Sequence, residues 1–367
     1  YNILVADKNF GQNSYVNLIN TNYYEPTKGI YENVLGTAYK ISDPNNMFAI
    51  WGSTAHSMQK ESAAEDLTTG QLVDTRIGKV SGNFKVNYRF RMLTDQYTHN
   101  AMGYLRRNNE FQNHLTFRYG KYQPTDLFLN WNTNLRLEHN SIYQPREFTD
   151  FNIIASGYGT LANYLSIGFW TKYRPVEMKD FFEPRVEGRH FNRPEFYYLN
   201  AWVSSDYRKP IALDLQGGIR KGYGGGYFYK IGPRFRLNHK ILLQYEFQYD
   251  LRTNERGYVT DYTPTSDTII FGKRNKTTYT NNIKASYVFN NKSWITLNLR
   301  HYWSQIDYKD YYFLKQNGDL QPNTVYDENN DFNFNAFNID LMYSWNFAPG
   351  SFLKVMWKNN IIESRDI

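Results

Sequence analysis

Apolar and polar residues alternate with a period of two over long stretches of this chain. In the segment 241–251, every odd-numbered residue is apolar or aromatic, and every even-numbered residue after Leu242 is an amide or a carboxylate. Successive side chains of a β-strand point to opposite faces, so this pattern predicts strands with one apolar face and one polar face. The same alternation recurs at 84–91, 127–137 and 337–347, where Phe128 and Met342 are exceptions.

The length of these runs indicates where such strands would reside. Strands of soluble domains average about 5–6 residues, whereas a tilted strand needs about 9–11 residues to cross a bilayer, and the alternating runs here reach the second length. In lipid, only a closed barrel lets strands pair every backbone group. The sequence therefore predicts an all-β, antiparallel transmembrane β-barrel, with the polar face toward the lumen and the apolar face toward lipid.

Composition excludes several other classes. The 367 residues contain no run of about 18 apolar residues, so a transmembrane helix is not expected. The 33 Tyr, 25 Phe and 8 Trp are too many for a disordered chain. Cys is absent, which excludes disulfides and thiolate metal sites, and the seven His show no His-Glu-x-x-His spacing. With no Gly-x-Ser-x-Gly elbow either, we expect no enzyme, no metal site and no cofactor.

The pattern predicts about 17 strands in a single domain over residues 1–367. The predicted ranges are 1–6, 14–23, 33–42, 46–56, 78–92, 110–121, 126–138, 147–158, 161–173, 196–207, 210–221, 227–238, 241–252, 277–289, 293–306, 332–347 and 351–363. Among the later strands, short and long connections tend to alternate, as in outer-membrane barrels, but 57–77 is a long segment on the short-turn side. An odd strand number leads us to expect missing strands at one or both ends.

Basic residues dominate the predicted polar face. With 42 Lys+Arg against 35 Asp+Glu, the formal net charge of the chain is +7. A net-positive wall would concentrate anionic solutes, and the alternative is that the arginines form cross-strand ion pairs that only stabilise the wall. The lumen-lining candidates are Lys85, Arg89, Arg91, Arg118, Arg136, Arg220, Lys230, Arg234, Arg236, Glu246, Lys284 and Arg300.

The connection 174–195 carries mixed charges and three prolines, which predicts an ordered loop pinned by ion pairs. It would either fold inward as a constriction or remain a solvated surface loop, and sequence alone favours the surface loop. The constriction candidates are Glu183, Arg185, Glu187, Arg189 and His190.

Three further motifs favour ordinary interpretations. The run 327–331 offers oxygen ligands suited to calcium but lacks the spaced Gly turn of a calcium loop, so a solvated loop is preferred. The aromatic residues at 308–313 could stack on sugar rings, although interface aromatics are commoner in such proteins. The Gly-rich run 222–226 has no following Lys-Ser/Thr pair and is interpreted as a hairpin loop instead of a phosphate site.

Two neighbouring segments carry a family resemblance. The sequences Phe-Phe-Glu-Pro-Arg-Val-Glu-Gly-Arg-His-Phe-Asn-Arg-Pro at 181–194 and Ser-Ser-Asp-Tyr-Arg-Lys-Pro-Ile-Ala-Leu-Asp at 204–214 resemble a Bacteroidota outer-membrane family of uncharacterised function. Weaker matches lie at 33–39 and 103–108. In that family a large barrel follows an N-terminal module similar to family-9 carbohydrate-binding modules, and this module is absent here. The resemblance implies a location in the bacterial outer membrane and lends no catalytic residues.

These observations lead to one functional expectation and one alternative. We expect a porin-like channel or transporter for a polar solute, with a saccharide suggested by the module that accompanies the resembling family. The alternative is a non-conducting barrel that serves as a structural or docking part of a larger envelope complex. The expected partners are outer-membrane lipid and lipopolysaccharide, envelope protein subunits and a saccharide. Nucleic acid is not expected, because the basic residues are spread strand by strand along one face.

Overall fold

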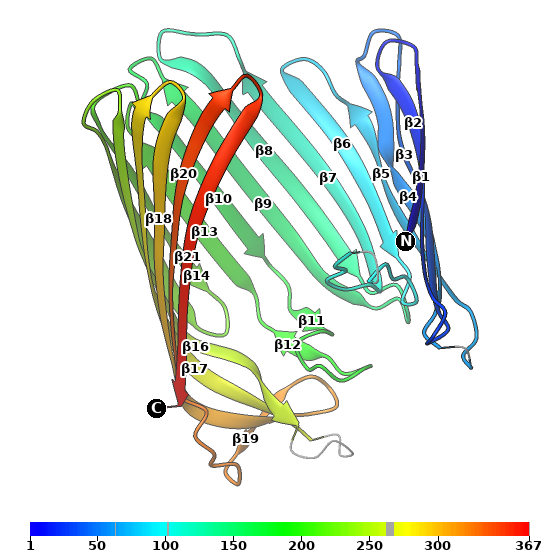
Figure 1. Ribbon diagram of the computed structural model, residues 1–367. Coiled ribbons are helices and arrows are strands. Elements are labelled where there is room, and N and C mark those ends of the chain that lie inside the picture. Colours follow the sequence, from blue (N-terminus) through cyan, green and yellow to red (C-terminus); the bar gives the residue numbers. More distant parts are fainter. Residues whose placement is uncertain (63, 101–102, 262–267, 367) are drawn as a thin grey trace. The chain divides into compact units, whose positions relative to one another are not determined.

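The computed structural model describes residues 1–62, 64–100, 103–261 and 268–366, and every regular element in these ranges is a β-strand (Figure 1). The strands are β1 (Asn2–Phe10), β2 (Ser14–Glu25), β3 (Ile30–Ser42), β4 (Phe48–Lys60), β5 (Thr68–Lys79), β6 (Phe84–Leu93), β7 (Glu110–Lys121), β8 (Phe128–Ser141), β9 (Phe148–Leu161), β10 (Ser166–Arg174), β11 (Met178–Asp180), β12 (Phe191–Arg193), β13 (Phe196–Ser204), β14 (Ile211–Lys221), β15 (Gly225–Arg236), β16 (Ile241–Asp261), β17 (Ile269–Asn290), β18 (Ser293–Leu314), β19 (Leu320–Asn323), β20 (Phe332–Ala348) and β21 (Ser351–Asp366). No helix in the described ranges is long and apolar enough to cross a membrane.

Nineteen of these strands belong to one sheet, and β11 and β12 form a separate two-stranded sheet. Strands β1 to β7 pair in succession, each antiparallel to the next. Strands β13 to β18 do the same, followed by β20 on β18 and β21 on β20. The short β19 pairs with the last residues of β18. The predicted all-β, antiparallel architecture is confirmed at this level.

The chain divides into two compact units. Unit 1 contains residues 1–121, 132–155 and 174–178, and unit 2 contains residues 122–131, 156–173 and the chain from 179 onward. Each unit is described by itself below. The expectation of a single domain over 1–367 stays a prediction.

Within unit 2 the cross-strand register places polar residues opposite polar residues and apolar residues opposite apolar residues. Gln244 of β16 lies opposite Lys284 of β17, which lies opposite Asn298 of β18. On the other face Tyr245 lies opposite Ile283. Pairing of this kind continues through the strands from β14 to β18 and on to β20 and β21. The predicted alternation therefore produces two continuous faces, one mainly polar and one mainly apolar.

The sequence prediction of about 17 strands was too low, because it missed β5 within 57–77 and the short strands β11, β12 and β19. Strands β4 and β5 occupy all of 57–77 except 61–67. The connection between them is therefore short, in agreement with the alternation of short and long connections along the chain. Strand β5 has few apolar residues and contains Gly70 and Gly78. A Cβ at Gly70 would overlap the backbone of Tyr97. The close approach that makes glycine necessary also removes the alternation that would have revealed the strand.

Strands β16, β17 and β18 are 21, 22 and 22 residues long, well beyond their predicted ends. The sequence analysis placed long loops at 253–276 and 307–331, of which 262–267 lies outside the described residues. Much of both regions is instead paired strand, interrupted by bulges between Arg252 and Glu255 and between Lys273 and Arg274. We call the parts of β16–β18 beyond these bulges, together with β19, the extension.

Apolar packing explains why the extension is ordered. Phe191 of β12 forms a buried cluster with Ile269 and Phe271 of β17 and Leu314 of β18. The Phe191 and Phe271 rings lie 4.6 Å apart, and neither side chain is exposed to solvent. The contacts join residues about 80 positions or more apart in the sequence, and local alternation does not encode them.

We predict that Phe191→Ala loosens the segment 181–193 from the extension. Truncating a buried Phe costs about 3–5 kcal/mol, and this loss falls on the contact between the two segments. Trypsin should then cleave after Arg185 or Arg189 many times faster than in the unaltered protein, as measured by mass spectrometry of a digestion time course.

The matched control is Tyr104→Ala, which truncates an aromatic ring that is 86% exposed. This variant should leave the cleavage rate at Arg185 and Arg189 unchanged. Equal protection of the segment in the Phe191→Ala variant would contradict the packing role.

Candidate functional site

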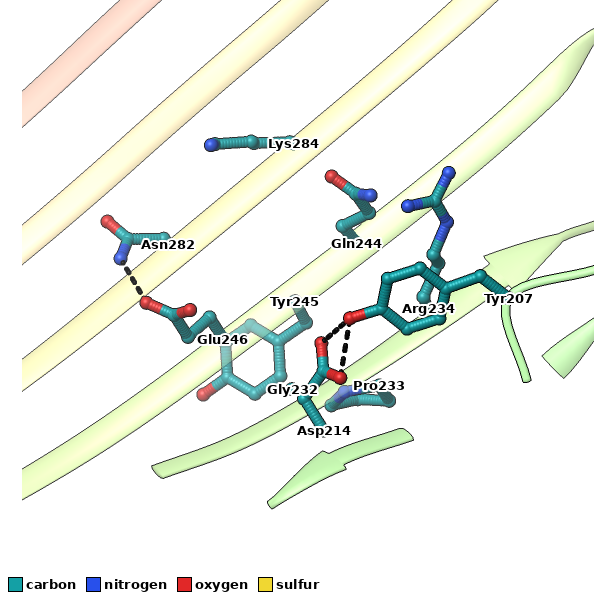
Figure 2. A pocket seen from close by; sticks show the side chains of 10 residues that line it. All are labelled: Tyr207, Asp214, Gly232, Pro233, Arg234, Gln244, Tyr245, Glu246, Asn282 and Lys284. Atoms are coloured by element: carbon teal, nitrogen blue, oxygen red, sulfur yellow. Dashed lines mark hydrogen bonds between the residues drawn. The ribbon is translucent and has the colours of Figure 1, made fainter. Parts of the chain in front are cut away.

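A small cavity lies on the polar face of unit 2, near the end where β14 and β15 meet β16 and β17 (Figure 2). Its volume is about 140 Å³. Charged, amide and aromatic groups line it together. The lining residues are Tyr207, Asp214, Gly232, Pro233, Arg234, Gln244, Tyr245, Glu246, Asn282 and Lys284.

Both carboxylates of the cavity are satisfied by neighbouring groups. The Tyr207 hydroxyl donates to Asp214 Oδ1 and Oδ2 at 2.5 and 2.6 Å (Figure 2). Glu246 accepts a hydrogen bond from Asn282 Nδ2 at 3.1 Å and forms an ion pair with Lys230 at 3.2 Å. These acids are therefore held in fixed positions with part of their charge compensated.

The two cations of the cavity have no such acidic partner. In the described part of the chain, no carboxylate lies within 4.0 Å of the charged nitrogens of Arg234 or Lys284. The Arg234 guanidinium instead lies 5.1 Å from the centre of the Tyr207 ring. Its Nε is buried and has no hydrogen-bond acceptor among the described residues.

The turn that carries Tyr207 is stabilised by its own ion pair. Arg208 donates to both Asp206 carboxylate oxygens, and its backbone N–H donates to Asp206 Oδ1 at 3.0 Å. The side-chain and backbone hydrogen bonds from Arg208 lower the pKa of Asp206 to about 2. The Arg208 guanidinium also lies over the Tyr164 ring, 3.2 Å from its centre. Asp206 therefore stays ionised across the physiological pH range, and its ion pair with Arg208 keeps the turn in position.

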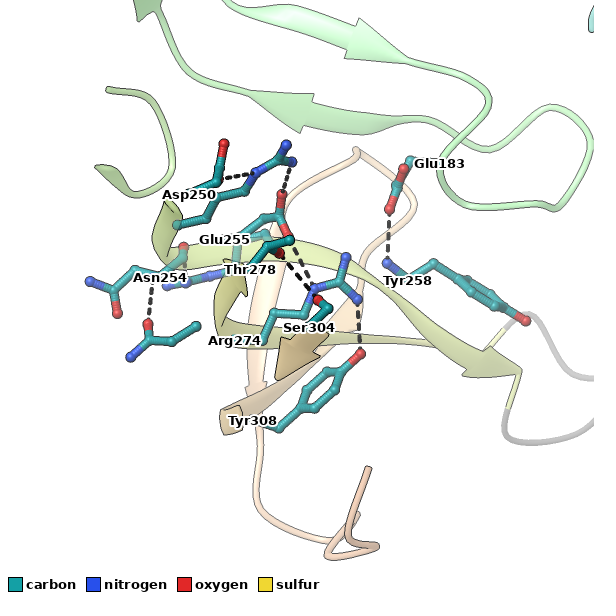
Figure 3. Close-up of polar contacts among 12 residues, drawn as sticks. Glu183, Asp250, Asn254, Glu255, Tyr258, Arg274, Thr278, Ser304 and Tyr308 are labelled. Atoms are coloured by element: carbon teal, nitrogen blue, oxygen red, sulfur yellow. Dashed lines mark hydrogen bonds and ion pairs between the residues drawn. The ribbon is translucent and has the colours of Figure 1, made fainter. Parts of the chain in front are cut away.

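A ladder of ion pairs continues along the same face toward the extension (Figure 3). Arg220 pairs with Asp250 at 2.6 Å, and Arg252 bridges Asp250 and Glu255 at 3.3 and 3.2 Å. Glu255 also pairs with Arg274 at 3.2 Å. Each acid contacts two guanidinium groups, so this part of the face is a closed electrostatic network.

Tyrosine and hydroxyl groups complete this network. Arg274 Nη1 donates to the Tyr308 hydroxyl at 2.9 Å, and Thr278 and Ser304 share a hydrogen bond of 3.2 Å (Figure 3). These contacts tie β17 to β18. The network therefore has a scaffolding role that the individual charges in the sequence did not reveal.

The polar face of unit 1 is organised in the same way. Arg89 binds Asp74 through two parallel hydrogen bonds, one of them 2.8 Å from Nε to Oδ1. Glu110 lies between Arg107 at 2.6 Å and Arg91 at 3.6 Å. Bidentate arginine–carboxylate pairs of this kind are the geometrically specific form of the interaction, and they link β5, β6 and β7.

Amide and acidic side chains also interact on the polar face of unit 1. Arg136 pairs with Glu138 at 2.8 Å, and Asn152 donates to Glu138 at 3.2 Å. Asn140 donates to Asp150 at 2.9 Å and lies 3.3 Å from the His114 ring nitrogen. Among the described residues, no group of three or more His, Cys, Asp or Glu side chains could hold a metal ion.

The structure divides the predicted lumen-lining residues into two sets. Acidic partners lie close to one set, which consists of Arg89, Arg91, Arg136, Arg220 and Lys230, with Glu246 as a partner. No ion pair within 4.0 Å is found in the described residues for a second set, which consists of Arg118, Arg234, Arg236, Lys284 and Arg300. Lys85 is half-buried opposite Arg118. That these residues line a lumen stays a prediction.

The predicted constriction residues lie in an ordered segment that packs on the extension of unit 2. Glu183 accepts a hydrogen bond from the Tyr258 backbone N–H at 3.1 Å (Figure 3). The Arg185 guanidinium lies 4.4 Å from the centre of the Tyr258 ring. Arg189 is buried and donates to the Leu314 carbonyl at 2.8 Å. These contacts tether the segment to β16 and β18.

The remaining residues of this segment differ in their surroundings. The His190 ring lies 5.3 Å from the Phe181 ring, whereas Glu187 is exposed. Arg193, which the sequence analysis did not select, pairs with Asp180 at 3.0 Å and Glu183 at 3.3 Å. The segment is thus pinned by ion pairs, and whether it constricts a path stays a prediction.

Sequence reasoning missed several groups of the cavity. Gln244 and Asn282 follow the alternation on the polar face but were passed over because the candidates were chosen by charge. Tyr207 lies in a turn, where alternation gives no signal. It does fall within 204–214, the segment that carries the family resemblance, and this was the one available indication.

This geometry defines a class of protein: an antiparallel β-sheet protein with an exposed apolar face and a polar face crossed by ion-pair ladders. The chain belongs to the family described as Domain of unknown function (DUF5916), which it matches over residues 1–367. The expectation of a family of uncharacterised function is confirmed, and its assignment to Bacteroidota barrels stays a prediction. A search of the curated proteins found no match.

We predict that paired and unpaired arginines of the polar face differ in their effect on stability. Arg220→Gln leaves Asp250, a half-buried acid, without its 2.6 Å partner, and should lower the free energy of unfolding by about 1–3 kcal/mol. Arg300→Gln removes an exposed charge with no acidic partner in the described chain and should change it by less than about 0.5 kcal/mol.

Urea unfolding followed by Trp fluorescence in one detergent would measure both variants. Both variants replace Arg by Gln, so the same chemical change is made at a paired, half-buried position and at an exposed position without an acidic partner in the described chain. Equal losses for the two variants would show that the ladder does not stabilise unit 2.

Proposed function

We propose that the chain forms an outer-membrane β-barrel that passes a polar solute through its lumen. The observation that carries the membrane part is the exposed apolar face of unit 2. Leu243, Tyr245 and Ile231 are between 37% and 42% exposed although they lie in the middle of paired strands. Soluble monomers rarely expose contiguous apolar patches larger than a few hundred Å². Exposing such an apolar face to water costs free energy, and a hydrocarbon environment would remove that cost.

Aromatic rows border the apolar face, as expected at two membrane interfaces. At one end, Tyr249 and Tyr279 have ring centres 5.1 Å apart, and Tyr279 stacks on Trp303 at the same distance. At the other end, Phe289 lies 4.8 Å from Tyr287 and 6.1 Å from Tyr343. Tyr and Trp are enriched where a membrane protein crosses the headgroup regions.

The separation of the two rows fits a bilayer. Tyr279 and Tyr287 lie on the same face of β17, and the rise of about 3.4 Å per residue places them about 27 Å apart along the strand. A strand tilt of about 40° reduces this to about 20 Å across the membrane, close to the apolar band of about 25 Å in outer-membrane barrels. Between the rows the face carries aliphatic residues such as Leu297 and Leu299.

Closure of the sheet is part of the proposal. In hydrocarbon every backbone N–H and C=O must be paired, and an open edge would leave a row of these groups without partners. Closure would place the polar face around an aqueous lumen. The cations that have no acidic partner within 4.0 Å among the described residues, including Arg118, Arg234 and Arg300, would then give the lumen a net positive potential.

The solute and the location follow from the family resemblance. A saccharide is proposed because the resembling outer-membrane family carries a carbohydrate-binding-like module. A second candidate function is a docking barrel within an envelope complex. It is favoured by the ordered platform that the segment 181–193 forms on the extension, since long external loops without a partner are commonly mobile. Lipid, lipopolysaccharide and envelope subunits remain the proposed partners.

We predict that the protein purified from membranes needs detergent for solubility and forms anion-preferring channels in planar bilayers. The reversal potential in a tenfold KCl gradient should report preference for chloride, because cations without an acidic partner in the described chain attract anions. Replacing Arg118 and Arg300 together by Gln should shift this potential toward zero. Replacing Arg220 alone by Gln should shift it less, since this removes one positive charge instead of two.

The outcomes separate the two candidate functions. A detergent-dependent protein without conductance that copurifies with defined subunits would favour docking. A protein that is monomeric and soluble without detergent would overturn the membrane proposal altogether.

A further inference from the structure

Arg234, Gln244 and Lys284 lie side by side on three adjacent strands. Arg234 of β15 is paired in register with Gln244 of β16, which is paired with Lys284 of β17. Neighbouring strands are about 4.8 Å apart, so the backbones of Arg234 and Lys284 are separated by about 10 Å. Both side chains are long enough to reach a single group bound above Gln244. Figure 2 shows all three on the cavity wall.

The acids of the cavity do not neutralise these two cations. Asp214 receives the Tyr207 hydroxyl in place of Arg234, and Glu246 is bound by Asn282 and Lys230 in place of Lys284. In the described chain, acidic oxygens approach neither Arg234 nor Lys284 within 4.0 Å. A buried guanidinium nitrogen without an acceptor is costly, and Arg234 Nε is such a nitrogen.

The Arg234 guanidinium is also held in position before any solute binds. The Tyr207 ring lies 5.1 Å from Arg234, and the Asp214 hydrogen bonds fix the tyrosine. A cation held over an aromatic face loses little freedom on binding. The planar fork of an arginine matches the two oxygens of a carboxylate, and Lys284 and the Gln244 amide supply further donors at the same level of the sheet.

We propose that Arg234, Gln244 and Lys284 form a binding site for the carboxylate of an acidic solute, such as a uronic acid sugar. The lining carries two cations and the carboxylates of Asp214 and Glu246, so it has no net positive charge to hold a dianion such as phosphate, and a single carboxylate suits the Arg234–Lys284 pair better. The cavity of about 140 Å³ accommodates the carboxylate group and part of a ring. This site deepens the proposed transport function and rests on it for its physiological role, although binding itself does not require conduction.

Saturation-transfer NMR on the detergent-solubilised protein tests the site directly. Sodium glucuronate is the probe and glucose is its neutral counterpart. The unaltered protein should bind glucuronate with at least tenfold preference over glucose. The double variant Arg234→Gln/Lys284→Gln should lose at least tenfold in affinity for glucuronate, whereas Lys284→Arg, which keeps the charge, should stay within about threefold.

Arg118→Gln is the control for the loss of one positive charge outside the cavity, because Arg118 lies on the polar face of unit 1. It should leave the affinity for glucuronate within about twofold. Circular dichroism and the heat-dependent shift on SDS gels verify that each variant is folded. Equal binding of glucose and glucuronate, or a double variant that binds as tightly as the unaltered protein, would overturn the site.

Conductance measured on the same preparations separates this inference from the proposed function. Glucuronate binding without any conductance would support the site and overturn transport. Anion-preferring conductance without glucuronate binding would support transport and overturn the site.

Discussion

Every strand in the middle of the unit 2 sheet is hydrogen bonded on both sides by antiparallel neighbours, and this ladder determines where each side chain points. The register from β14 to β18 and on to β20 and β21 is continuous apart from bulges at the extension and at two hairpin ends. A shift by one residue would move the whole apolar row to the polar face. The separation of the two faces, the ion-pair ladders and the cavity all depend on that register.

The polar face shows how one chemical group serves two purposes. Arg220 and Arg274 form ion pairs with acids of β16, at distances of 2.6 and 3.2 Å, and hold strands together. Arg234 lies on the same face of the same sheet but has an aromatic ring as its neighbour. The difference arises from the acids, because Asp214 is engaged by a tyrosine and Glu246 by a lysine and an amide. What remains around the small cavity is a pair of cations, Arg234 and Lys284, with no carboxylate within 4.0 Å in the described chain.

Particular elements show what the sequence could predict. The alternation at 241–251 and 337–347 located strands and separated their polar side chains from their apolar ones, since a period of two directly reports the geometry of a strand. The sequence analysis did not predict strand β5, because Gly70 and Gly78 interrupt its alternation at positions where the backbone of another segment comes close. The sequence analysis did not predict the extension, because its strands are ordered by tertiary packing against Phe191, which is distant in the sequence.

The sequence by itself determined the class of fold, the antiparallel strands and the identity of their faces, because each of these follows from local periodicity and charge. It also identified the basic residues that occupy the polar face. Only the tertiary structure decided which of them are neutralised, because a side chain finds its partner across strands through the register. For the same reason the grouping of Tyr207, Arg234 and Lys284 around one cavity emerged only from the folded sheet, in which a turn and two strands distant in sequence lie side by side.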